Sequence, residues 1–210
     1  MKKFILFLMA ICLVIPTVEA QNKTLEKARK KEYKLKMKEY KKEGWKLFGS
    51  SRSLDVALLT HYDKLNALGE DGHEIVGVAS KCKSKNIGRQ MALNNACVTY
   101  AQEAGSKVKG RVVSDMQGDG VNADTEFDKF YAAYERLVDK EIRGEMMESY
   151  SVIRELGDGT FEVQAFFIIN ESAASRARLR AMEQASRETE MAQKYAKKIS
   201  DFVREGFKEE

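Results

Sequence analysis

The sequence predicts an α+β protein: a two-layer domain in which two helices cover a four-stranded, mainly antiparallel sheet. Three observations lead to this prediction. The chain has 210 residues, a high charge and a single proline, which favours a helix-rich globular protein. Helical apolar periodicity alternates with short β-branched runs. A turn signal near residue 158 separates two strand-like runs. We expect the core order strand, helix, strand, helix, strand, strand, flanked by N-terminal helices and a long C-terminal helix.

The hairpin is the clearest element of the sequence. Asp158 and Gly159 form a pair that is typical of two-residue primed turns. Alternating apolar runs precede and follow this pair, over residues 145–156 and 161–170. The residues of the second run that we expect on one face are Phe161, Val163, Ala165 and Phe167.

Two helices are expected before the sheet. Residues 24–42 contain no helix breaker and many good helix formers, and Gly44 ends this segment. Residues 53–68 carry an apolar stripe at helical spacing. Ser53 is a typical N-cap for this second helix, and Gly69 is a typical stop.

Four further elements complete the predicted core. A β-branched run over residues 74–81 predicts a strand. Small residues at helical spacing predict a helix over 86–105, which Gly105 ends. We expect a second strand over 107–116 and a third long helix over 125–144 before the hairpin.

The C-terminal region has a helical pattern from residue 171 to residue 207. Its apolar residues follow a 4/3 spacing with a gap at Glu188, typical of a narrow coiled-coil-like seam. One helix of about 35 residues would be roughly 50 Å long, more than a small domain covers. The N-terminal helix is the nearest candidate partner, and a solvated tail that docks only at its start is the alternative. The seam residues are Ala181, Ala185, Ala192, Tyr195, Ile199 and Phe202.

The N-terminus resembles a secretory signal peptide. Residues 1–20 begin with two lysines, continue with an apolar core of about a dozen residues and end at a small residue, Ala20. The apolar core is too short to span about 30 Å of hydrocarbon. Cys12 follows Ile11, whereas a lipidated cysteine needs a small residue before it. We therefore expect cleavage before Gln21 and export to the periplasm or cell envelope, or out of the cell.

Residues 73–170 resemble a known family. A strand that ends in "GVAS" leads into an alanine-spaced helix, and a "DGTFEVQAFF" hairpin closes the unit. This pattern is similar to the Lpp-twenty family of bacterial envelope lipoproteins and to the N-terminal domain of the flagellar T-ring protein. The resemblance implies an envelope α+β domain with a structural or binding role and no catalytic residues. It does not imply a lipid anchor, because the sequence has no lipobox.

Catalytic and metal-binding signatures are missing from the sequence. There is no G-x-S-x-G motif and no phosphate-binding glycine loop. His61 and His73 are 12 residues apart and have no cysteine or histidine at zinc-ligand spacing. The acidic loop 115–128 does not follow the calcium-binding EF-hand spacing. We expect no enzymatic activity, no cofactor and no metal, with His61 packed on the apolar stripe of its helix.

A basic arm is the strongest binding candidate. Residues 23–42 carry ten Lys or Arg and three Glu, a net charge of +7, in a chain of net charge +4. Its narrow apolar face consists of Tyr33, Met37 and Tyr40. This helix could pack on the C-terminal helix, lie on an anionic membrane or polymer, or bind a protein partner. The expected contact residues are Lys27, Lys30, Lys31, Lys34, Lys38 and Lys41.

Cys82 and Cys97 could form a disulfide, which an exported protein can keep. The predicted elements argue against it. Cys82 ends a strand, and Cys97 lies about three helical turns, or some 15 Å, beyond the start of the next helix. A disulfide needs Cα atoms within about 7 Å of each other. We therefore expect two separate reduced thiols.

The sequence thus predicts four regions and a non-catalytic function. The regions are a signal peptide (1–20), a basic helical arm (21–44), an α+β domain (45–170) and a long C-terminal helix (171–210). We expect an exported bacterial cell-envelope protein with a structural or binding domain, whose terminal helices mediate self-association or docking. The alternative is a binder of an anionic surface or polyanion through the basic helix. No nucleic-acid partner is expected.

Overall fold

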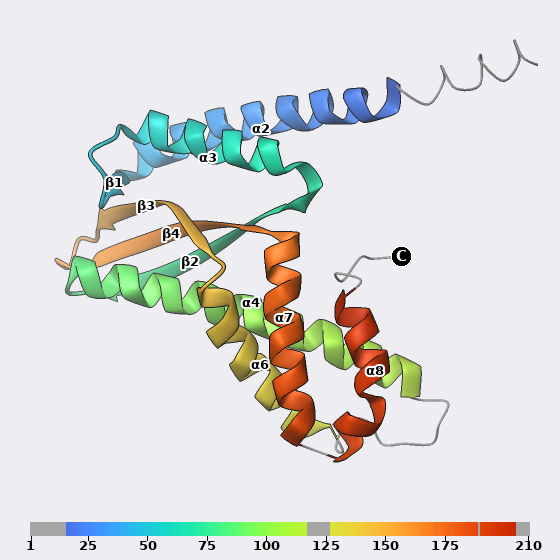
Figure 1. Cartoon of the computed structure of the whole chain (residues 1–210). Coiled ribbons are helices and arrows are strands. Elements are labelled where there is room, and N and C mark those ends of the chain that lie inside the picture. The colour runs from blue at the N-terminus through green and yellow to red at the C-terminus, as the bar shows by residue number, and fades with distance from the viewer. Residues whose placement is uncertain (1–15, 117–126, 189, 205–210) are drawn as a thin grey trace, which may run out of the picture.

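The computed structural model describes residues 16–116, 127–188 and 190–204. It is a mixed helix and sheet structure with a four-stranded antiparallel sheet (Figure 1), so the predicted α+β class is confirmed. Of the signal peptide predicted over residues 1–20, residues 1–15 fall outside the described residues, and residues 16–20 form the start of α2. The loop predicted over residues 117–124 also falls outside them. The strands are β1 (Lys46–Phe48), β2 (Gly72–Cys82), β3 (Met147–Glu155) and β4 (Phe161–Asn170). The helices are α2 (Pro16–Glu43), α3 (Leu54–Leu68), α4 (Lys85–Met116), α6 (Asp128–Arg143), α7 (Glu171–Ala185) and α8 (Glu190–Arg204).

The sheet has the strand order β1-β3-β4-β2, with every pair antiparallel. The predicted β3–β4 hairpin is confirmed, but its turn is one residue longer than predicted. Residues 157–159 form a three-residue loop that the Leu156 N–H closes by donating to the Thr160 carbonyl, at 2.7 Å. Gly159 has a φ of 78°, as expected where a left-handed residue follows a type I turn.

Both faces of the sheet are covered by helices, whereas the sequence predicted helices on one face only. Val163, Ala165 and Phe167 of β4 pack in a core with α4. The alternate residues Phe166 and Ile168 pack in a second core with α2 and α3. Figure 1 shows α2 and α3 on one side of the sheet and α4 on the other. Strands buried on both faces have nearly continuous apolar sequences, as residues 165–169 do.

The predicted strand over 107–116 is wrong, because these residues form the last part of α4. Val108 and Val112 are spaced for one helix face and are buried in a helical core, so tertiary packing overrides their β propensity. Gly105 does not end the helix. A Cβ at Gly105 would lie 2.4 Å from Glu135 of α6, so this glycine allows two helices to approach closely. The fourth strand is instead the short β1, which lies where no strand was predicted.

The predicted single C-terminal helix is also wrong. It is broken after α7 by a 3₁₀ turn, Ser186–Glu188, at the gap in the apolar seam, and α8 then folds back beside α7 (Figure 1). Four of the seam residues are buried and the other two pack against the same core, which α4, α6, α7 and α8 share. The N-terminal helix is not their partner. The seam is therefore satisfied within the chain.

The helical predictions before the sheet are confirmed. The helix predicted over 24–42 lies within α2, and the helix predicted over 53–68 is α3. Ser53 is the N-cap of α3, where its side chain accepts a hydrogen bond from the Val56 N–H, and Gly69 is the C-cap. Helix α2 packs on α3 and on β3 and β4 through a shared core.

Both core cysteines are free thiols and both are buried, which agrees with the prediction. Cys82 ends β2, and Cys97 lies in α4 with no solvent exposure. Burial raises the pKa of the Cys97 thiol. The thiol is therefore protonated at neutral pH, and Cys97 is an inert packing residue rather than a reactive site.

The crossing of α4 over β2 gives the first testable prediction. A Cβ at Gly77 would lie 1.8 Å from the Ala92 carbonyl oxygen, and backbone atoms cannot yield as a side chain does. We expect Gly77→Ala to destabilise the protein by about 3 kcal/mol. Gly110, also in α4, has open space at its Cβ, so Gly110→Ala should stabilise by up to about 1 kcal/mol. Urea unfolding measures both changes, and equal stability of the two variants would contradict the close crossing.

Candidate functional site

The lysines predicted to bind a partner all lie on the exposed side of α2. With about 100° between successive residues, five of them share a single line along the helix with Lys23. We call this line the lysine row. Its members follow each other at intervals of 4, 3, 4, 4 and 3 residues, and the row is about 27 Å long. The lysine row consists of Lys23, Lys27, Lys30, Lys34, Lys38 and Lys41, and the sixth predicted residue, Lys31, lies beside it.

The apolar stripe on the inner side of α2 fixes the direction of the lysine row. Met37 and Tyr40 are buried in the core that α2 shares with α3 and the sheet. The Tyr40 hydroxyl lies 3.2 Å from the hydroxyl of Tyr150 on β3. The Tyr33 hydroxyl donates to Asp55 of α3 at 3.2 Å. Because these contacts hold the stripe inward, the lysine row faces solvent.

The position of Lys36 also shows which side of α2 faces the protein. It lies between two row residues in sequence but points to the inner side of the helix. Its Nζ is 5.0 Å from the centre of the Phe166 ring and 5.8 Å from that of Tyr40. These are cation–π distances. Lys36 therefore helps to dock α2, whereas Lys34 and Lys38 remain exposed.

The glutamates of the arm do not interrupt the lysine row. At 100° per residue, Glu32 and Glu39 lie beyond the inward stripe, on the side away from the row. Glu26 lies close to the line of the stripe itself. The positive charge of α2 is therefore concentrated on one side of the helix, where its field attracts anions.

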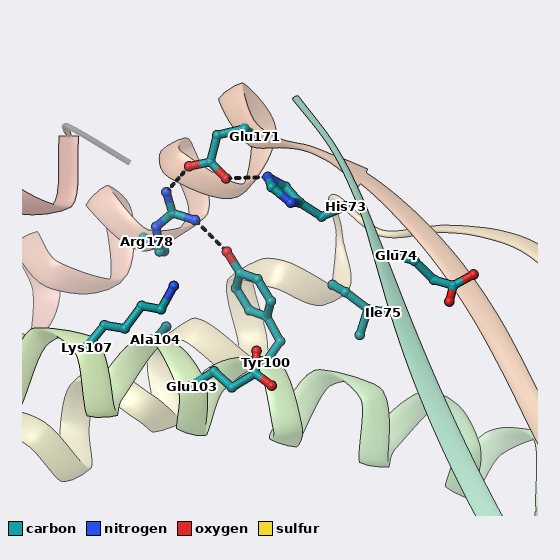
Figure 2. A pocket seen from close by; sticks show the side chains of 9 residues that line it. All are labelled: His73, Glu74, Ile75, Tyr100, Glu103, Ala104, Lys107, Glu171 and Arg178. Carbon is teal, nitrogen blue, oxygen red and sulfur yellow. Dashed lines mark hydrogen bonds and ion pairs between the residues drawn. The ribbon is translucent and has the colours of Figure 1, made fainter. Parts of the chain in front are cut away.

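A pocket between β2, α4 and α7 is the second candidate site (Figure 2). Its cavity has a volume of about 260 Å³. The sheet and the helical core meet here, because β4 continues directly into α7. The residues that line it are His73, Glu74, Ile75, Tyr100, Glu103, Ala104, Lys107, Glu171 and Arg178.

A chain of polar contacts crosses the wall of this pocket, as Figure 2 shows. Arg178 is 1% exposed, and its Nη1 donates to the Tyr100 hydroxyl at 2.6 Å. Its Nη2 donates to Glu171 at the start of α7. The same carboxylate pairs with the His73 Nε2 of β2 at 3.1 Å. The four side chains tie β2, α4 and α7 together.

The protonation states in the pocket follow from these contacts. Burial raises the pKa of the Tyr100 phenol, and Arg178 offsets only part of that rise. Burial also acts to raise the pKa of Glu171, but hydrogen bonds from His73 and Arg178 outweigh it, so the Glu171 pKa is lowered. At neutral pH the pocket therefore holds a protonated phenol and a carboxylate already shared by two partners. This arrangement is typical of a structural ion-pair network.

The two histidines lie in different environments. His61 is fully buried in α3, as predicted, and its Nε2 lies 2.5 Å from the Glu74 carboxylate. Glu74 therefore turns to the face of the sheet that α3 covers. His73 is half exposed and pairs with Glu171 on the other side. Within the described residues, no cluster of three or more histidine, cysteine, aspartate or glutamate side chains is placed to hold a metal ion.

The pocket was not predicted from the sequence, although one signal was present. Arg178 occupies the position between Ala174 and Ala181 on the alanine stripe of α7. An arginine on a stripe of small buried residues must be buried too, and a buried arginine needs a carboxylate partner. That partner, Glu171, is seven residues earlier on the same helix.

No family model, curated protein or solved structure matches the chain. The resemblance to the Lpp-twenty family therefore stays a prediction. Among helices in the described parts of the chain, none is both long enough and apolar enough to cross a bilayer.

The pocket network gives a prediction about pH. Because the folded-state pKa of Glu171 is lowered, its contribution to stability is complete above about 4.5, the pKa of an unshifted glutamate, and is lost as the pH falls through the folded-state pKa. We expect Glu171→Gln to be less stable than the parent at pH 7, with a difference that shrinks in acid. Urea unfolding of both proteins, from pH 7 down to acid pH, measures this difference in stability. A difference that stays constant with pH would show that the charge of Glu171 contributes nothing.

Proposed function

We propose that this chain is an exported bacterial cell-envelope protein whose folded domain has a binding role and no catalytic one. In this proposal α2 is the binding element, and an anionic surface or polymer of the envelope is its partner. The sheet, α3 and the helical core serve as the rigid support that presents α2.

The exposure of the lysine row, beside an apolar stripe that packs on α3 and the sheet, is the observation on which the proposal rests. A helix of this composition that was free on all sides would be a solvated arm. Here the stripe is held by Tyr33, Met37 and Tyr40, so the cations face outward as a fixed set. Fixed charges lose less freedom on binding than mobile ones do.

Self-association through the terminal helices, which the sequence suggested, receives less support. The C-terminal seam is occupied by the chain's own α4, α6 and α7, and α2 packs on α3 instead. Membrane insertion by α2 also receives less support, because an interfacial helix needs its apolar face for lipid. Charge is the property of α2 that remains available to a partner.

A protein partner is the second candidate function, and one observation favours it. Ile87, Met91 and Val98 of α4 are 61%, 42% and 42% exposed, and their spacing places them near one helix face. Exposed apolar groups that lie together on a folded surface often mark a protein contact. This patch is small, so it ranks below the lysine row.

Fractionation of bacterial cells that produce the full chain tests the proposed function. We expect the protein in the envelope fraction, with a mass that corresponds to cleavage before Gln21. It should stay bound in low salt and be released by high salt, because surface charges are screened within about 3 Å at 1 M salt. The triple variant Lys27→Gln, Lys34→Gln, Lys41→Gln should be released at lower salt.

A matched control variant loses the same number of positive charges at positions outside α2. Lys64, Lys81 and Lys83 are exposed, and their triple change to glutamine should leave retention unaltered. Recovery in the cytosolic fraction, or retention that salt does not reduce, would refute the proposal.

A further inference from the structure

The shape of the lysine row carries information about the partner, beyond the sign of its charge. A patch that binds a flat anionic surface can spread its cations over any part of the exposed side. The exposed lysines of α2 are instead gathered within about 120° of the helix circumference: six follow one another along the row, which is about 27 Å long, and Lys31 and Lys42 flank it. Its members are about 4.5 to 6 Å apart along the axis.

Among the described side chains of α2, the flanks of the row offer little apolar surface for entering a bilayer. Among the described side chains of α2, Leu35 is the one large apolar group that is strongly exposed, at 59%. It lies about 60° round the helix from Lys38 of the row, and a single side chain supplies little of the apolar face that an interfacial helix needs. The aromatic residues that anchor interfacial helices, Tyr33 and Tyr40, are turned to the protein.

The row is also held straight over much of its length. Arg29 donates to Asn66 near the end of α3 at 2.8 Å, Tyr33 contacts Asp55 near its start, and Tyr40 contacts β3. These attachments fix the helix from which the lysines project, so the spacing of their Cα atoms is set by the fold. A ligand with anions at a regular repeat can then pair with several lysines at once, and each further pairing adds to the affinity.

We infer that the partner of α2 is an extended linear polyanion, such as a phosphate or uronate polymer, which lies along the lysine row. This inference rests on the proposed function and names the class of its ligand. The polymer is recognised by the repeat of its charges rather than by its individual groups.

A charge exchange within α2 separates recognition by the row from attraction to net charge. Lys38 belongs to the row, and the exposed Glu39 beside it does not. Lys38→Glu with Glu39→Lys keeps the composition and net charge of α2 but puts a carboxylate in the row. The matched control is Asp63→Lys with Lys64→Asp, an exchange between two exposed neighbours on α3. Fluorescence of Trp45, the single tryptophan, confirms that each variant is folded.

The probes are inorganic polyphosphate, polygalacturonate, and vesicles of equimolar phosphatidylcholine and phosphatidylglycerol. We expect the parent to bind both polymers more tightly than the vesicles, with an affinity that falls as salt rises. The exchange in α2 should weaken polymer binding about tenfold or more, because it replaces an attraction by a repulsion in the middle of the contact. The control exchange should change it less than about twofold.

The experiment distinguishes failure of this inference from failure of the proposed function. If vesicles bind as tightly as the polymers, or if the exchange in α2 has no more effect than its control, the linear polyanion is refuted while the proposed function stands. If neither the polymers nor the vesicles bind at low salt, the proposed function fails and the inference fails with it.

Discussion

The burial of β4 on both faces is the constraint from which the arrangement of the protein follows. Phe167 and Phe166 are neighbours in sequence, so their rings point to opposite sides of the sheet, and each side needs a cover. Helix α4 supplies one cover. The other requires both α3 and α2, because the rings of Tyr150 and Phe166, stacked with centroids 4.4 Å apart, continue toward Tyr40. The N-terminal helix is therefore part of the core, and its lysines face solvent as a consequence.

Helix α4 joins the two halves of the molecule. Its first part packs on the sheet through Ala92 and Ala96, and its last part enters the helical core through Val108 and Val112. The network around Arg178 lies where these parts meet and links α4 to β2 and α7. This pocket is the structural junction of the fold. The lysine row lies on the exposed side of α2, which covers the opposite face of the sheet.

The features that were predicted correctly from the sequence are those that depend on residues close together in the chain. The Ser53 cap and the glycine of the β3–β4 turn act within a few residues, so the sequence alone located them. Gly105 and Val112 were misread because their roles depend on α6 and α8, which are distant in sequence. Helical spacing alone places the lysines of α2 along one line, but the direction in which this line faces depends on how the apolar stripe packs on α3 and the sheet. Arg178 was missed because the pocket depends on contacts distant in sequence: its partner Tyr100 lies on α4, 78 residues away.

The orientation of α2 is the central claim, and amine labelling of the native protein measures it most directly. Lys34, Lys36 and Lys38 are close in sequence, and Lys36 lies over two aromatic rings while the other two are exposed. Mass spectrometry after brief acetylation should find Lys36 labelled much more slowly than Lys34 and Lys38, and this difference should vanish in denaturant. Equal rates for the three lysines in the native protein would show that α2 is not docked as described.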